Sequence, residues 1–147
     1  MDRAEISQMN ASMTERVLAT SAAPIEEGGY ALRVVRTVGR RSGERRATPL
    51  GVARRDGHLY LISPQVGRDW VRNLHADPWC ETEAGDERVE YRATVPEPTV
   101  AAAAVATYLR SVQVPWAVAA FPVPADASEA EIAEHLETIA VLRLDPS

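Results

Sequence analysis

The feature that most constrains the fold is a series of short apolar runs separated by turn signals between residues 30 and 95. Residues 30–38 and 58–63 are rich in Val, Leu and Ile, which is typical of β-strands, and residues 47–54 between them are predicted to be a further strand. The dipeptides Asp56-Gly57 and Gly85-Asp86 follow such runs and favour tight hairpins. This pattern lacks the regular alternation of strands and helices that a doubly wound fold requires, and it predicts an antiparallel sheet.

The other elements are predicted from periodicity and capping signals. Asp69 is expected to cap a helix over residues 70–76, and Ser128 with Glu131 forms a capping box for a helix over 128–137. A third helix is expected over 99–112, and residues 114–127 are expected to be irregular. Further strands are predicted over residues 79–84, 88–95 and 139–144. The fold class is therefore α+β: five or six antiparallel strands that close on themselves, with peripheral helices.

The N-terminal segment, residues 1–28, is predicted to be a helical extension of a single domain whose core spans 30–147. Ile6, Met9, Met13 and Val17 recur at helical spacing and form one apolar face. We expect this face to pack on the core. A partner chain or a membrane surface is the alternative, because such surfaces also bind amphipathic helices.

Composition excludes several kinds of chemistry. All 16 basic residues are arginine, so no lysine is available for a Schiff base or a phosphate-binding loop. The single cysteine, Cys80, and three scattered histidines predict no metal site. No basic segment followed by an apolar run opens the chain, and no apolar stretch reaches membrane-spanning length. We therefore expect a soluble cytoplasmic protein. Membrane association through the N-terminal helix is the alternative.

Charge is distributed unevenly along the chain. The net charge is −5, yet residues 33–72 hold ten arginines against three acidic residues, a local balance of +7. Four of these arginines, at positions 40, 41, 45 and 46, crowd around one turn. Like charges so close repel one another unless an anion lies among them. A compact basic segment in an acidic chain predicts a small anionic ligand and argues against a nucleic-acid partner.

The same segment, residues 38–50, resembles the hallmark of the deazaflavin-dependent nitroreductase family, Gly-Arg-(Arg/Lys)-Ser-Gly-x-x-Arg-x-x-Pro-Leu. The stretch 67–74, with its Trp-x-x-Asn-Leu pattern, and Asp77-Pro78 extend the resemblance. It implies a split β-barrel of the FMN-binding type and the cofactor F420, a deazaflavin that carries a phosphate and an oligoglutamate tail. It also implies a small-molecule electron acceptor as partner and, in many relatives, a homodimer.

The resemblance also implies site residues. The phosphate and tail would contact three arginines and the backbone of the turn, and the deazaflavin ring would lie beside the start of the next strand. The residues implied for cofactor binding are Arg40, Arg41, Ser42, Gly43, Arg46, Thr48, Pro49, Leu50, Ser63, Arg68 and Trp70. The acceptor would meet Trp116 and Phe121, taken as exposed aromatics of a Pro-rich loop, and Tyr108 or water would donate a proton.

The function implied is an F420H2-dependent oxidoreductase that transfers a hydride from reduced deazaflavin to an electron-poor quinone, enone or nitro compound. Two alternatives stay open. One is a non-catalytic protein of the same fold that binds F420 or a hydrophobic ligand, and the other is an FMN-dependent relative. A long polyanion suits several arginines better than a single phosphate does, which favours F420 over FMN.

Overall fold

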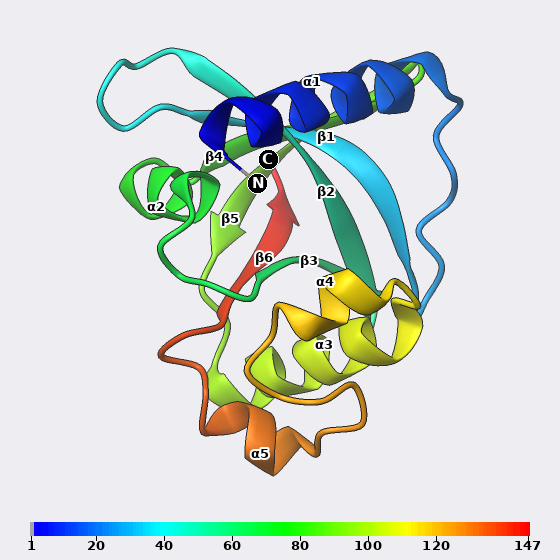
Figure 1. The fold of residues 1–147 in the computed structure, drawn as a ribbon, viewed down its shortest axis with the longest axis vertical. Coiled ribbons are helices and arrows are strands. Elements are labelled where there is room, and N and C mark those ends of the chain that lie inside the picture. Colours follow the sequence, from blue (N-terminus) through cyan, green and yellow to red (C-terminus); the bar gives the residue numbers. More distant parts are fainter. Residues whose placement is uncertain (1) are drawn as a thin grey trace.

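The computed structural model describes residues 2–147, and its centre is a closed six-stranded antiparallel barrel (Figure 1). The order around the barrel is β1-β2-β3-β6-β5-β4, and β4 pairs with β1 to close it. The barrel with helices outside it confirms the predicted fold class. The strands are β1 (Tyr30–Val38), β2 (Arg45–Arg55), β3 (His58–Ser63), β4 (Trp79–Ala84), β5 (Glu87–Thr94) and β6 (Ala140–Pro146).

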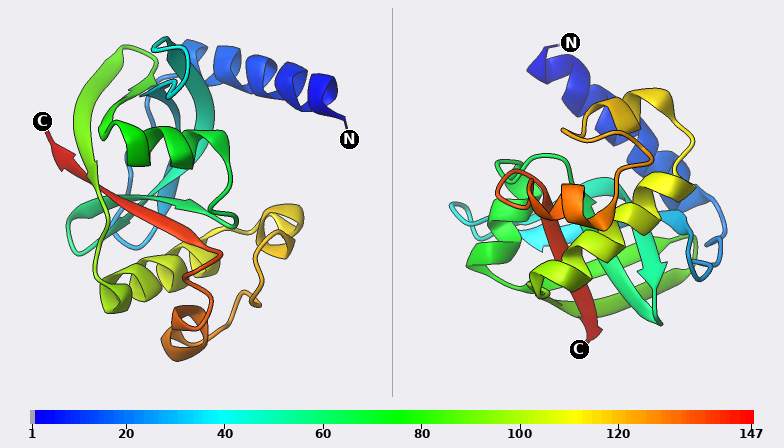
Figure 2. Two further views of the ribbon diagram at one scale, coloured as in Figure 1. Left: turned by 90° about the vertical axis from the view of Figure 1, so that its left-hand side faces the viewer. Right: turned by 90° about the horizontal axis from the view of Figure 1, so that it is seen from below.

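Five helices surround the barrel within the described residues. They are α1 (Arg3–Ala19), α2 (Asp69–Ala76), α3 (Pro98–Ser111), α4 (Pro115–Ala119) and α5 (Glu129–Ala133). Figure 2 shows that the N-terminal part of α1 extends beyond the barrel, on the side where α4 also lies. None of the helices in residues 2–147 is both long and apolar enough to cross a membrane.

The barrel interior is filled by alternating apolar side chains of the strands. Val35, Val52 and Leu61 are at most 1% exposed and pack there with side chains of β4, β5 and β6. Helix α2 joins this cluster through Trp70 and Leu74, so that helix is anchored on the barrel core. This position of α2 brings its first turns close to the β1–β2 turn.

Two further clusters lie outside the barrel. The Ala-rich face of α3 packs on β2, β3 and β6, and fully buried Leu109 and Ile132 lie in this cluster with Phe121. Small side chains let α3 approach the strands closely, which explains why the run of alanines is buried. Helix α1 rests on Val34 and Ala84 through Val17.

Several predicted details are corrected. Asp69 does not cap α2: it is the first helical residue, and Arg68 precedes the helix without a capping side chain. Ser128 does cap α5, accepting a hydrogen bond from the Glu131 N–H at 3.1 Å, but the helix ends at Ala133. The segment expected to be irregular contains α4, where Pro115 takes the first helical position.

The apolar face of α1 packs on the core only in its C-terminal half. Val17 is buried and Met13 is half-buried, whereas Ile6 and Met9 are 46% and 52% exposed. The prediction of a core-packed face is therefore confirmed for the second half of the helix and wrong for the first. The helix runs past the edge of the barrel, so its first turns find no strands to cover them.

Candidate functional site

The β1–β2 turn, residues 39–44, is held by its own backbone. The Gly39 N–H donates to the Glu44 carbonyl at 2.7 Å, and the Gly43 N–H donates to the Gly39 carbonyl at 2.8 Å. Ser42 Oγ accepts a hydrogen bond from the Glu44 N–H at 3.1 Å. Gly43 has φ +73°, where glycine is favoured, and a side chain on Gly39 would meet Ser42 Oγ at 2.7 Å. The glycines and the serine of the motif therefore serve the shape of this turn.

Helix α2 fixes the turn through Arg40. Asn73 Oδ1 accepts hydrogen bonds from the Arg40 backbone N–H at 3.2 Å and from Arg40 Nη1 at 2.9 Å. Arg40 Nη2 also pairs with Asp69 Oδ1 at 3.2 Å. Asn73 is 4% exposed, and its Nδ2 donates to Thr37 Oγ1 at 3.3 Å. The arginine turn is thus held in place before any ligand binds.

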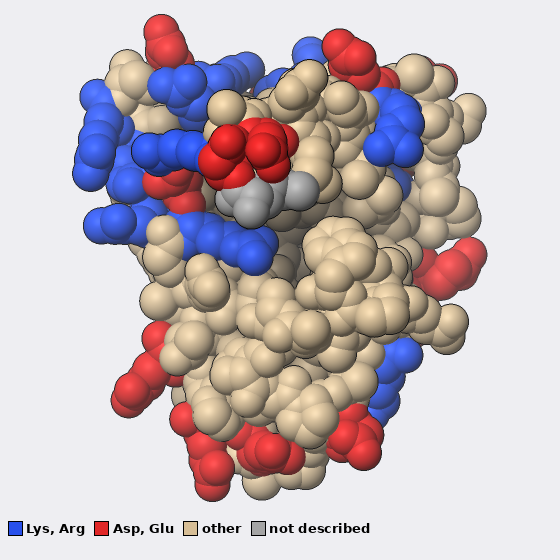
Figure 3. Space-filling model, viewed as in Figure 1, with Lys and Arg blue, Asp and Glu red and all other residues tan. Residues whose placement is uncertain are grey.

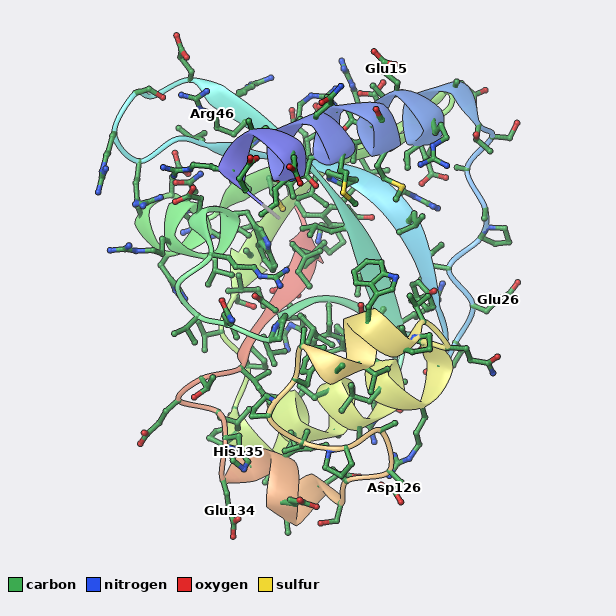
Figure 4. The ribbon with its side chains drawn as sticks, in the orientation of Figure 1. Glu15, Glu26, Arg46, Asp126, Glu134 and His135 are labelled. Carbon is green, nitrogen blue, oxygen red and sulfur yellow. The ribbon has the colours of Figure 1, made fainter. Side chains whose placement is uncertain are left out.

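A pocket of about 490 Å³ lies between this turn, α2 and the start of α1, and we call it the anion pocket. Its charged lining consists of four arginines and one carboxylate, Asp69. Arginines gather on this side of the surface, over the turn and α2, beside a hollow in the molecular face (Figure 3). Arg46, labelled in Figure 4, extends from the start of β2 at this side. The lining residues are Arg3, Ser7, Thr37, Gly39, Arg40, Arg41, Ser42, Arg46, Ala47, Thr48, Asp69, Trp70 and Asn73.

The arginines of the turn are not equivalent. Arg45 places its guanidinium 4.3 Å from the ring centroid of Trp79, in a cation–π contact away from the pocket lining. Arg46, its neighbour, lines the pocket and comes no closer than 3.8 Å to the exposed Glu44 carboxylate. Arg41 also lines the pocket, and it forms no ion pair within residues 2–147. Successive strand residues point to opposite faces, which separates Arg45 from Arg46.

Comparison with known proteins places the chain in a family. The profile of the F420H2-dependent quinone reductase family matches residues 7–133. The chain belongs to this family. A search of curated protein sequences gave no significant match.

Solved structures support the fold. The conserved hypothetical protein Rv2991 from Mycobacterium tuberculosis superposes with a TM-score of 0.55 at 17% identity, over 99% of this chain and 81% of that one. A heme binding protein from Mycobacterium smegmatis gives a TM-score of 0.51 at 22% identity, over 93% of this chain and 51% of that one. General Stress Protein 26 from Bacillus anthracis gives 0.50 at 11% identity, over 92% and 87%. At these low identities, the superpositions show a shared fold alone.

Six of the residues implied for cofactor binding meet in the anion pocket of this quinone reductase family member: Arg40, Arg41, Ser42, Arg46, Thr48 and Trp70. Five others do not line it: Gly43, Pro49, Leu50, Ser63 and Arg68. Ser63 is fully buried, and its hydroxyl is engaged by the Gln65 backbone, donating to the carbonyl at 2.7 Å and accepting from the N–H at 3.2 Å. Its hydroxyl therefore serves the loop after β3.

Sequence reasoning missed the pocket residues Arg3, Ser7, Thr37, Gly39, Ala47, Asp69 and Asn73 as candidates. Asn73 carried a usable signal, because it is the asparagine of the Trp-x-x-Asn-Leu pattern. The sequence predicts Asp69 as a helix cap and gives no sign of its pairing with Arg40. Arg3 had no signal, since it lies more than thirty residues before the motif and reaches the pocket only through the path of α1.

Trp70 has an unusual polar atom. The residue is 5% exposed and lines the anion pocket, and its buried Nε1–H has no hydrogen-bond partner in residues 2–147. A buried donor without a partner is costly, so most buried donors find one. Trp70 also belongs to the barrel core cluster, so this donor is closed to solvent.

The residues implied for the acceptor side lie in a different environment. Trp116 on α4 is 74% exposed, in agreement with the predicted exposed aromatic. Phe121 is 8% exposed and belongs to the α3 cluster, so its predicted exposure is wrong. The chain turns back after α4, and Phe121 packs against Tyr108 with ring centroids 6.0 Å apart. Apolar burial explains its position fully.

Tyr108 lies on α3, next to Phe121 and to Tyr30 of β1. Its ring meets Tyr30 edge-on at 5.8 Å, and both rings lie over Gly51 of β2, where a side chain would meet Tyr30 at 3.0 Å. Burial raises the pKa of Tyr108, the nearby Tyr30 raises it further, and the charge of Arg68 opposes this shift. The Tyr108 phenol is therefore protonated at neutral pH, as a proton donor must be.

Neither the cysteine nor a metal site adds chemistry in the part of the chain that the structure describes. Burial raises the pKa of the Cys80 thiol to about 12, which makes it a packed apolar residue. No group of three or more His, Cys, Asp or Glu residues within 2–147 could hold a metal ion.

Proposed function

We propose that the anion pocket binds the phosphate and oligoglutamate tail of coenzyme F420, and that this protein uses F420H2 to reduce an electron-poor acceptor. The observation that carries the proposal is the pocket itself, in which four arginines and one carboxylate line a space of about 490 Å³. Membership of the F420H2-dependent quinone reductase family supports a quinone as the acceptor. Enones and nitro compounds are the other acceptors of the same electronic character.

The residues present fit such a cofactor. Guanidinium groups bind phosphate and carboxylate oxygens in bidentate geometry, and Arg41 and Arg46 are available for this. Arg40 contributes its charge while Asn73 and Asp69 fix its position.

The remainder of the cofactor would follow β2 away from the pocket. Arg46 and Thr48 are two residues apart on the same face of β2, and both line the pocket. A ligand anchored at Arg46 would therefore extend along this face of the strand, whereas Gly51, an odd number of residues from Arg46, lies under Tyr30 and Tyr108 on the other face. Bound F420H2 would supply the hydride, and the protein would bind and orient the cofactor.

Equilibrium titration with F420, followed by cofactor fluorescence, tests the cofactor assignment, with FMN titrated in parallel. We expect F420 to bind more tightly than FMN, and the double variant Arg41→Ala/Arg46→Ala to weaken F420 binding more than tenfold, or more than about 1.4 kcal/mol. The variant Arg92→Ala/Arg110→Ala removes the same charge from exposed positions outside the pocket and should bind normally. Equal affinity of the two double variants would reject the anion pocket as the cofactor site, and preference for FMN would reject F420.

Tyr108 is proposed as the proton donor to the reduced acceptor, and Trp116 as an exposed aromatic on the acceptor side. The variant Tyr108→Phe keeps the ring packing on Tyr30 and Phe121 and removes only the hydroxyl. If Tyr108 donates the proton, kcat with a quinone should fall about a hundredfold while F420 affinity stays unchanged. Unchanged kcat would leave water as the donor.

A further inference from the structure

The N-terminal end of α1 forms one wall of the anion pocket. Arg3 and Ser7 lie one helical turn apart and line the pocket together with Arg41 and Arg46 of the β1–β2 hairpin. Two segments separated by more than thirty residues thus present arginines to the same space. The motif residues 39–50 provide one side of the pocket, and a helix outside the motif provides the other.

The charges of this pocket are not balanced within the protein. Asp69 is engaged by Arg40 at 3.2 Å, which leaves Arg3, Arg41 and Arg46 as the remaining lining charges. Asp2, next to Arg3, accepts the Glu5 N–H at 2.8 Å as the cap of α1. Arg3 has no ion pair within 4 Å among residues 2–147, and Arg46 has only the exposed Glu44 at 3.8 Å. Converging cations of this kind attract an anion with several charged groups.

The protein itself holds this end of α1 weakly. Residues 3–12 are all exposed, and the packing of α1 on the barrel rests on Val17 with half-buried Met13 and Leu18. Short helices without tertiary packing are marginally stable in water. The first turns of α1, which extend beyond the barrel in Figure 2, are therefore a part of the fold that a bound ligand can stabilise.

We infer that Arg3 is an additional anion-binding residue, and that a long oligoanion bridges it to Arg41 and Arg46 and docks the first turns of α1 on the ligand. The ligand class is a chain of several phosphates or carboxylates, because three arginines from two segments of the chain line this space. The identification of that chain with the F420 tail rests on the proposed function. Arg3 would then make affinity depend on the length of the oligoanion.

The test compares Arg3→Ala with Arg16→Ala, an exposed arginine of the same helix that does not line the anion pocket. F420 and inorganic tripolyphosphate are titrated against both variants, with orthophosphate as the short anion. We expect Arg3→Ala to weaken F420 and tripolyphosphate binding about three- to fivefold and to change orthophosphate binding little. Arg16→Ala should change the binding of all three ligands little. Equal affinities of Arg3→Ala and Arg16→Ala for the long anions would overturn the inference.

Amide hydrogen exchange of residues 3–12 gives a second readout that does not depend on activity. Tripolyphosphate or F420 should slow exchange in this segment in the unchanged protein and in Arg16→Ala, but not in Arg3→Ala. Exchange that is unaffected by either ligand would contradict docking of α1. Tight F420 binding with no contribution from Arg3 removes this inference alone, whereas protection by tripolyphosphate without F420 binding removes the proposed cofactor and retains the role of Arg3.

Discussion

Two groups of charged residues on this barrel differ in how their charges are satisfied. On the outer face of β1, β4 and β5, Arg36 and Arg88 pair with Glu81 and Glu83, and we call these four residues the paired network. In the anion pocket, Arg3 and Arg41 have no ion pair among residues 2–147. Both groups contain arginines on or beside β1, yet one group is neutral and the other is strongly positive.

The difference shows which arginines are structural and which are available to a ligand. In the paired network, Glu81 is buried to 6% side-chain exposure and is approached by Arg36 at 3.5 Å and Arg88 at 3.4 Å. Such contacts fix strand neighbours and leave little charge for a partner. In the pocket, the Asp69 carboxylate is engaged by Arg40, and Arg3 and Arg41 have no ion pair among residues 2–147. The proposed ligand site therefore rests on arginines without ion pairs and not on the number of arginines.

The largest expected effect comes from breaking the paired network at Glu81. The variant Glu81→Ala leaves Arg36, whose side chain is 20% exposed, with Glu83 as its only carboxylate partner. We expect a loss of about 2–3 kcal/mol in the free energy of unfolding, measured by urea denaturation, because the largely buried Arg36 guanidinium loses one of its two carboxylate partners. F420 affinity should not change. Exposed Glu137 is the matched control position for Ala substitution, and equal stability of the two variants would contradict a structural role for the network.

A smaller effect is expected at Asn73, which connects the pocket to the core. The variant Asn73→Ala removes the acceptor of two Arg40 hydrogen bonds and the donor to Thr37, at a cost of about 1–2 kcal/mol in the free energy of unfolding. Because Arg40 belongs to the turn that we propose binds the F420 tail, F420 affinity should fall in the same variant. Stability and affinity both change here, unlike at Glu81.

Asp69→Asn is the counterpart of Asn73→Ala. This variant removes the carboxylate from the pocket wall and releases the Arg40 guanidinium, so F420 affinity should stay equal or rise. Its side chain is 73% exposed, and the loss of an exposed pair should change stability by less than about 1 kcal/mol. Parallel losses of affinity in both variants would mean that Arg40 acts only as part of the turn scaffold.

Much of the barrel could be predicted from the sequence, because hairpin signals and strand periodicity are local. Asp56-Gly57 forms the β2–β3 turn, with Asp56 at φ 50° and Gly57 at φ 74°. The sequence predicts helix ends less well than strands. Asp69 is predicted to cap α2, but it is the first residue of that helix and pairs with Arg40. A tertiary contact replaced the local role that its position in the sequence indicated.

The candidate site was predictable only on its motif side. Arg40, Arg41 and Arg46 lie within one continuous segment, and the resemblance identified them together. Arg3 depends on the direction of α1, and no local pattern encodes that direction. The predicted exposure of Phe121 is wrong for the opposite reason. A Pro-rich segment indicates an exposed loop, but the chain returns onto α3 and buries the ring. Both errors concern packing between distant segments.

The smallest expected effect is the acid response of the paired network at Glu83. Burial alone would raise the pKa of Glu83, but hydrogen bonds and charges from Arg36 and Arg88 outweigh burial and lower the pKa below its ordinary value of 4.5. A carboxyl whose folded-state pKa is lowered stabilises the fold above the unfolded pKa and loses that contribution as pH falls through the folded pKa. Urea denaturation of Glu83→Gln should thus show lower stability near pH 7, by less than about 1 kcal/mol, and a difference that declines as the pH falls below 4.5 and vanishes below the folded-state pKa. A difference that persists in strong acid would mean that the Glu83 side chain contributes through packing and not through its charge.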